Sequence, residues 1–176
     1  RLQEAAKGQP FQIVLAGLAH PNDGGGLEAI RVLGARIDAL EGAIPVAFVP
    51  GYNLDMAATL VAGCDIWLNT PLPPLEASGT SGMKAALNGA LNLSVLDGWW
   101  VEGCVDGVTG WSIASNGAEA SDAGALYDKL RDVVLPLYHS DRGRWIWMMK
   151  QAISKIGPSF SSHRMMRRYV TEAYLR

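Results

Sequence analysis

The sequence predicts an α/β protein with a Rossmann-like parallel sheet that carries helices on both faces. Two observations predict this fold class: several short runs are almost wholly apolar, and segments with apolar residues at helical spacing lie between them. Such alternation is typical of βαβ units in an open parallel sheet. Ligands of these sheets bind beyond the carboxyl ends of the strands, so we expect a site in the loops that follow the strands.

Each strand of the predicted sheet is a short apolar run. The first three are residues 11–19 (FQIVLAGLA), 45–50 (PVAFVP) and 65–70 (DIWLNT), and a fourth ends at Leu96. Apolar residues recur at helical spacing over residues 27–40, between the first two strands. A shorter helix at residues 53–61 is expected before the third strand.

Beyond Trp111 the pattern changes to three helices. Ser121 is expected to cap the first helix, and Gly157-Pro158 is expected to end the second. The third begins near Ser161 or Ser162. We expect all three to pack through their apolar faces.

We expect one domain, residues 1–176, with an α/β region at 1–115 and a helical region at 116–176. A content of 49% hydrophobic and 18% charged residues is enough for one sizeable core. The net charge of -2 provides no general attraction to nucleic acid or to an anionic membrane.

The cysteines and the ends of the chain indicate its surroundings. Cys64 and Cys104 have no zinc-like spacing, so we expect no metal and a reducing cytoplasm. No apolar stretch approaches the roughly 20 residues of a membrane span. Because the chain opens without methionine, we expect its numbering to begin inside a longer protein.

The most informative stretch is residues 75–91, LEASGTSGMKAALNGAL, which leads from a proline-rich loop into a short helix. Gly79 and Gly82 permit a tight turn, and Thr80 or Ser81 is expected to cap the helix. The free N–H groups at the positive end of the helix would form an anion cradle that suits a phosphate.

Lys84 follows Thr80 by four residues and Ser81 by three, so in a helix its side chain lies on the same side as their hydroxyls. Its apolar neighbours Met83, Ala85 and Leu87 are expected to desolvate the amine in part, which favours Schiff-base chemistry. An ordinary surface lysine beside a capped helix fits the same spacing. From spacing alone both interpretations stay open.

The run E-A-S-G-T-S-G-M-K-A-A-L-N-G-A-L, from Glu76 to Leu91, resembles the cofactor segment of the glycogen and α-glucan phosphorylases, which depend on pyridoxal phosphate. The resemblance continues through residues 49–52 (VPGY), 65–70 (DIWLNT), 96–103 (LDGWWVEG) and 157–162 (GPSFSS). It covers most of the chain, and the paired tryptophans resemble the short bacterial branch of the family.

The resemblance implies a cofactor site. Lys84 would be the catalytic lysine that holds pyridoxal 5′-phosphate covalently in the intact enzyme, and Thr80, Ser81 and Gly82 would bind the cofactor phosphate. Tyr52 would line the cofactor pocket. A tyrosine in a turn is equally suited to simple packing, so both roles stay open for Tyr52.

The resemblance also implies a sugar site, in which Glu76, Ser78 and Gly79 would meet the hydroxyls of the glucosyl unit. A carboxylate accepts hydroxyl hydrogens strongly, although a solvated loop carboxylate is the alternative for Glu76. We expect Asp97-Gly98 to form a turn rather than to act as an acid, and Trp99-Trp100 to form a hydrophobic cover.

The implied activity of the intact enzyme is phosphorolysis of an α-1,4-glucan to glucose 1-phosphate, with the glucan and phosphate as its partners. The family adds an N-terminal domain, and the two Rossmann-like lobes of this GT-B fold enclose the glucan groove. The chain would be part of the C-terminal lobe. The family's basic segment of the K-R-x-H-x-Y-K-R type has no match here, so we expect the isolated chain to be inactive. Homodimer formation stays open.

Two alternatives compete with a phosphorylase. A GT-B glycosyltransferase that uses a nucleotide sugar would need neither pyridoxal phosphate nor a lysine at position 84. A non-catalytic module would bind a phosphate and turn nothing over.

Overall fold

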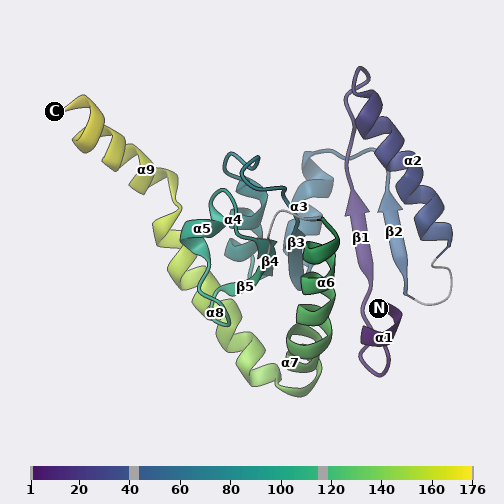
Figure 1. Cartoon of the computed structure of the whole chain (residues 1–176). Helices are drawn as coiled ribbons and strands as arrows, with labels where there is room; N and C mark the ends of the chain where they lie inside the picture. Colours follow the sequence, from purple (N-terminus) through teal and green to yellow (C-terminus); the bar gives the residue numbers. More distant parts are fainter. Residues whose placement is uncertain (1, 40–43, 115–118, 176) are drawn as a thin grey trace.

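The computed structural model describes residues 2–39, 44–114 and 119–175. Within these ranges five strands, all paired in parallel, alternate with helices (Figure 1). The predicted fold class is therefore confirmed. The end of the predicted helix at Leu40 and the predicted boundary between residues 115 and 116 lie outside the described residues.

The first part of the chain is a βαβ unit with a short helix before it. Its elements are α1 (Leu2–Ala5), β1 (Ile13–Ala16), α2 (Gly24–Asp38) and β2 (Val46–Val49). The strands pair in parallel with Val14 opposite Ala47. Helix α2 begins after Asp23, whose carboxylate accepts a hydrogen bond of 2.9 Å from the N–H of Gly26.

A second sheet carries most of the buried residues. Its strands are β3 (Ile66–Asn69), β4 (Leu91–Val95) and β5 (Gly110–Ile113), and its connections carry α4 (Thr80–Leu87) and α5 (Trp100–Gly103), with α3 (Leu54–Gly63) before β3. The order is β3-β4-β5, so β4 is central, and all five of its residues are buried. A strand with no exposed residue is what a parallel sheet covered on both faces requires.

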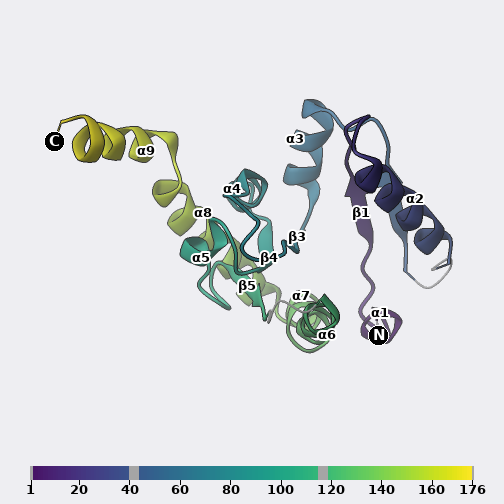
Figure 2. The same cartoon turned by 45° about the horizontal axis from the view of Figure 1, so that its top comes forward.

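The strands form two sheets and not the single open sheet that the alternation predicts. In both views of the ribbon, β1 is the strand of the first sheet that lies nearer to β3 (Figures 1 and 2). The two sheets remain separate because no ladder of hydrogen bonds joins β1 to β3 among the described residues.

Three helical rods follow the sheets, as predicted, but two of their expected ends are wrong. They are α6 (Glu119–Lys129) continued by η1 (Leu130–Val134) and α7 (Leu135–Ser140); α8 (Arg142–Ser159); and α9 (Ser162–Tyr169) continued by η2 (Val170–Tyr174). Helix α6 begins at Glu119, so Ser121 lies inside it. Helix α8 continues through Gly157 and Pro158 and ends at Ser159. A proline this near the end removes only one helical hydrogen bond. The next bond is kept, since Phe160 N donates to Ile156 O at 2.8 Å.

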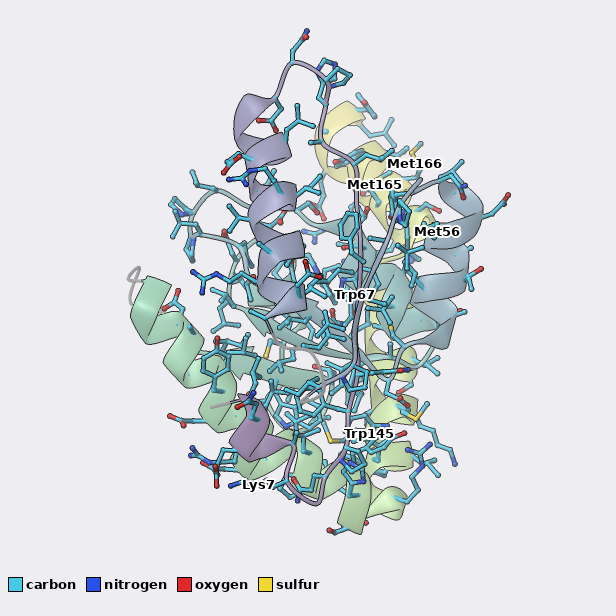
Figure 3. All side chains as sticks on the ribbon, turned by 90° about the vertical axis from the view of Figure 1, so that its right-hand side faces the viewer. Lys7, Met56, Trp67, Trp145, Met165 and Met166 are labelled. Carbon is cyan, nitrogen blue, oxygen red and sulfur yellow. The ribbon has the colours of Figure 1, made fainter. Side chains whose placement is uncertain are left out.

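The main core lies between the second sheet and the helical rods. The fully buried rings of Trp100, Trp111 and Trp145 fill it. Trp145 lies where α7 and α8 meet (Figure 3), and its ring centroid is 5.7 Å from that of Trp111 and 4.9 Å from that of Tyr138. Helix α8 also packs against α4 and β4, and these contacts help to fix the position of α4, the helix that carries Lys84.

Helix α9 leaves the body of the molecule (Figure 2). Ser161 caps it, as predicted, by accepting a hydrogen bond from Arg164 N. The expected burial of its apolar face is not found, since Met165, Met166 and Tyr169 are exposed; Figure 3 marks the two methionines on this helix.

Burial is uneven along the chain. No described residue before Ile44 is buried, whereas buried residues are frequent from Gly82 to Ile156. The βαβ unit at the N-terminus therefore contributes little to the core of the described chain.

Candidate functional site

The candidate site begins in the loop before α4, at Gly79. This residue has φ of +80°, which favours glycine, and it is the N-cap of α4 without any side-chain cap. The expected capping by Thr80 or Ser81 is therefore wrong. The left-handed turn at Gly79 starts the helix one residue early, so both hydroxyl residues belong to its first turn.

The first turn of α4 has the character of an anion site. Among the described residues, no acceptor pairs with the backbone N–H groups of Thr80, Ser81 or Gly82. Unpaired N–H groups at a helix N-terminus carry a partial positive charge and attract anions. The three residues that the resemblance assigns to the cofactor phosphate thus present one such end.

Gly82 fixes this turn on the central strand. The side-chain amide of Asn92, buried in β4, donates to Gly82 O at 3.0 Å. A Cβ atom at Gly82 would lie 2.5 Å from Asn92 Oδ1 and 2.9 Å from Cζ2 of Trp99. Only glycine fits at this place, because strand and ring both approach the helix backbone.

Lys84 lies one turn after Thr80 in α4, on the side that the helical spacing predicts. Its side chain is exposed, so the expected partial desolvation is wrong for this chain: Met83 and Ala85 turn inward and leave the lysine in solvent. The amine is accessible to a cofactor. The carbonyl of Lys84 accepts a 2.9 Å hydrogen bond from the amide of Asn88, which closes the helix end.

The loop before α4 brings together the residues predicted for the sugar. A Cβ atom at Gly79 would lie 3.3 Å from the carboxyl carbon of Glu76, so this side chain folds back towards the helix start. Among the described residues, no hydrogen bond or ion pair engages the carboxylate of Glu76. Ser78 O accepts a 2.9 Å hydrogen bond from Trp99 N.

Tyr52 does not join this group. It follows β2 and its side chain is exposed, and no hydrogen bond or ring contact links it to α4 within the described ranges. Trp99 and Trp100 are both buried, which confirms the predicted hydrophobic cover.

Two residues near the site have roles that the sequence did not predict, since Asn92 was not singled out and Asp97 was expected only to form a turn with Gly98. Asn92 holds the first turn of α4, and Asp97 accepts a 2.9 Å hydrogen bond from Glu76 N. A polar residue within an apolar strand was the available signal for Asn92. For Asp97 the signal was an aspartate directly after a strand and before a glycine, which is a common position for side-chain bonds to backbone N–H groups.

The described residues contain no group of three His, Cys, Asp or Glu that could hold a metal ion. Of the helices described, none has both the length and the apolar character needed to cross a membrane.

The α/β fold matches part of a larger solved structure of the GT-B type. A crystal structure of Anabaena Alr3699/HepE in complex with UDP and glucose superposes with a TM-score of 0.72 at 20% identity, over 97% of this chain and 42% of that one. A second structure of the same protein, with UDP-glucose, gives a TM-score of 0.71. Likeness at this identity concerns the fold alone.

The sequence comparisons identify the family. The family model described as carbohydrate phosphorylase matches residues 10–122. The maltodextrin phosphorylase of Thermococcus litoralis is 46% identical over 173 residues, which are 94% of this chain and 21% of that protein. The glycogen phosphorylase of Aquifex aeolicus is 46% identical over 176 residues, which are 94% of this chain and 25% of that protein. The chain belongs to the carbohydrate phosphorylase family, and it spans about a fifth to a quarter of these relatives.

Proposed function

We propose that this chain is the cofactor- and glucosyl-binding portion of an α-glucan phosphorylase, which cleaves an α-1,4-glucan with phosphate to give glucose 1-phosphate. The observation that carries the proposal is the open N-terminus of α4, with an accessible lysine one turn further on, in a chain of the carbohydrate phosphorylase family. We place the protein in the cytoplasm, because its cysteines, Cys64 and Cys104, are free thiols and suit a reducing compartment.

The residues of α4 fit pyridoxal 5′-phosphate. The N–H groups of Thr80, Ser81 and Gly82 would hold its phosphate, and the amine of Lys84 would anchor it covalently. When bound, the cofactor would supply a phosphate that exchanges a proton with the substrate phosphate. Two phosphates next to each other need positive partners, and a helix N-terminus provides them without a mobile side chain.

The loop from Glu76 to Gly79 would orient the glucosyl unit. The carboxylate of Glu76 is available for sugar hydroxyls because the described chain gives it no partner, and charge-assisted hydrogen bonds of this kind are strong. Tyr52 remains a proposed member of the cofactor pocket. The glucan, phosphate and the remaining domain of the enzyme are the proposed partners.

Reductive trapping tests the proposal. The protein is saturated with pyridoxal 5′-phosphate and reduced with borohydride, and the modified peptides are mapped by mass spectrometry. We expect the pyridoxyl group on Lys84, and the Lys84→Arg variant should lose it while keeping the positive charge. Lys150 and Lys155, on α8, serve as internal controls for nonspecific modification. A saturated sample with an unmodified Lys84 would refute the cofactor role.

Release of glucose 1-phosphate from maltodextrin and phosphate tests the second part of the proposal. We expect none from the 176 residues alone, because the lysine lies in solvent and the other wall of the site is not formed by the described residues. Turnover by the isolated chain would show that these residues are sufficient.

A nucleotide-sugar glycosyltransferase is the second candidate, because the similar fold of Anabaena Alr3699/HepE was solved with UDP-glucose. That function predicts binding of UDP-glucose that survives Lys84→Arg, and no trapping at position 84. The two functions therefore give opposite results in the same experiment.

A further inference from the structure

The carboxylate of Asp97 joins two loops that are far apart in sequence. Its Oδ2 accepts a hydrogen bond of 2.9 Å from Glu76 N, and its Oδ1 accepts one of 2.9 Å from Gly98 N. Asp97 is half-buried, and both oxygens are used by backbone donors. Hydrogen bonds from N–H groups to an ionised carboxylate are about twice as strong as neutral ones.

The residues after Asp97 tighten the same junction. Trp99 N donates to Ser78 O at 2.9 Å, so one backbone bond and one bond to the Asp97 side chain hold the loop at two points. Gly98 has φ of +51°, and a Cβ atom there would lie 2.6 Å from Ser78 O and 3.0 Å from Cγ of Glu76. The loops therefore approach more closely than any side chain at position 98 would allow.

The junction is also fixed to the helix. The ring of Trp99 is buried and lies against Gly82 in the first turn of α4. The segment from Asp97 to Trp99 thus contacts both the loop of Glu76 and the helix that presents the free N–H groups. A change at Asp97 would free the backbone at Glu76, while the bond from Trp99 N to Ser78 O and the contact of Trp99 with Gly82 would remain.

We propose that Asp97 is a positioning residue for the glucosyl site, and that it holds the backbone of Glu76 so that the carboxylate of Glu76 faces the ligand beside α4. The inference rests on the proposed function, since that function makes Glu76 a sugar ligand. The two carboxylates have separate roles. Each oxygen of Asp97 accepts from a backbone donor, whereas no hydrogen bond engages the carboxylate of Glu76 among the described residues.

The role requires two acceptor oxygens. Asparagine has the same shape but offers one oxygen and one NH2 group, so Asp97→Asn would set a donor against a backbone N–H. Asp97→Ala would remove both bonds. The loop should loosen in both variants, and the effect should be larger for alanine.

Asp106 provides a matched control. Its Oδ1 accepts from Ser112 N at 2.8 Å and from Ser112 Oγ at 3.0 Å, and its Oδ2 lies 3.5 Å from Lys129 Nζ. None of these contacts involves the loop of Glu76. The Ala and Asn variants of Asp106 therefore change another carboxylate that binds a backbone N–H, and they also remove its ion pair with Lys129.

The test combines three measurements on wild type and on the Ala and Asn variants of Asp97 and Asp106: hydrogen exchange of the Glu76 amide by NMR, binding of glucose 1-phosphate by ligand-observed NMR, and borohydride trapping of pyridoxal phosphate on Lys84. For Asp97→Ala, which removes the acceptor of Glu76 N, we expect exchange about tenfold faster or more, the size expected for losing one charge-assisted bond. Asp97→Asn should show a smaller increase, because its single oxygen can still accept from one of the two N–H groups. For Asp97→Ala we expect sugar binding about tenfold weaker and trapping on Lys84 unchanged. Both Asp106 variants should leave all three as in wild type.

The outcomes separate the role from its premise. Unchanged exchange at Glu76 in Asp97→Ala, or faster exchange with full sugar affinity, would overturn the positioning role. An equal loss of sugar binding in Asp106→Ala would also overturn it, because general destabilisation would then explain the effect. If wild type neither traps the cofactor nor binds the sugar, the proposed function fails and the positioning role fails with it, while the exchange data still decide whether Asp97 holds the loop.

Discussion

Replacing Gly82 by alanine adds one methyl group at the point where α4, β4 and Trp99 meet. The new Cβ atom would lie 2.5 Å from Asn92 Oδ1 and 3.0 Å from Nε1 of Trp99. Overpacking of this kind costs about 1–3 kcal/mol. Alanine recovers about 0.5–1 kcal/mol through its helix propensity. The difference is a net loss of up to about 2.5 kcal/mol in the free energy of unfolding.

Gly34→Ala is the matched control. Gly34 lies inside α2, and no atom of the described chain comes within 4 Å of a Cβ atom placed there. The same substitution should therefore stabilise α2 by about 0.5–1 kcal/mol. Urea unfolding followed by circular dichroism measures both variants, and the opposite signs isolate the effect of close packing. If Gly82→Ala stabilises the chain as much as Gly34→Ala does, Asn92 and Trp99 do not approach α4 as closely as described.

Two further predictions concern a thiol and a pair of tryptophans. Burial, with a smaller contribution from the charge of Asp106, raises the pKa of Cys104 from 9.0 to about 11. Only the thiolate reacts with iodoacetamide, so at pH 8 the reagent should modify Cys104 about 100-fold more slowly in the folded chain than in urea. Quantitative mass spectrometry of the Cys104 peptide checks this, and equal rates would show that the thiol is not shielded. Trp145→Ala should lower the free energy of unfolding by about 3–5 kcal/mol because the ring is fully buried, whereas Trp147→Ala on the same helix should cost about 2 kcal/mol or less, since 38% of that residue is already exposed and it loses partial burial and a contact with Arg144. Similar losses in the two unfolding curves would contradict the assignment of Trp145 to the core.

The sequence was sufficient to predict four of the five described strands, because those four read as short apolar runs. β5 was not predicted, since Gly110 and Ser112 interrupt its apolar residues. β2 and β3 lie within the predicted ranges 45–50 and 65–70. Helix ends were less predictable. Ser121 has the chemistry of a cap, but the helix begins before it, and Pro158 is tolerated because it lies near the end of α8.

The site was predictable where chemistry is local and not where it depends on contacts between distant segments. The spacing of Thr80 and Lys84 sufficed to place both on one side of α4, since both lie on one helix. The bond between Asp97 and Glu76 spans 21 positions, and no local pattern indicates such a contact. The exposure of Lys84 could not be predicted from the sequence either, because apolar neighbours can pack against the lysine or against the core.

The uneven burial of the chain has a consequence for how it opens. The N-terminal βαβ unit contributes no buried residue before Ile44, so few apolar contacts oppose its separation from the rest. Partial unfolding should therefore begin there and leave the second sheet and α8 closed. Amide protons of β1 and α2 should exchange through this local opening, while those of β4 should exchange only when the whole chain unfolds. A protease would accordingly find its first cleavage sites in α2, and the helix that carries Lys84 would stay intact in the resistant product.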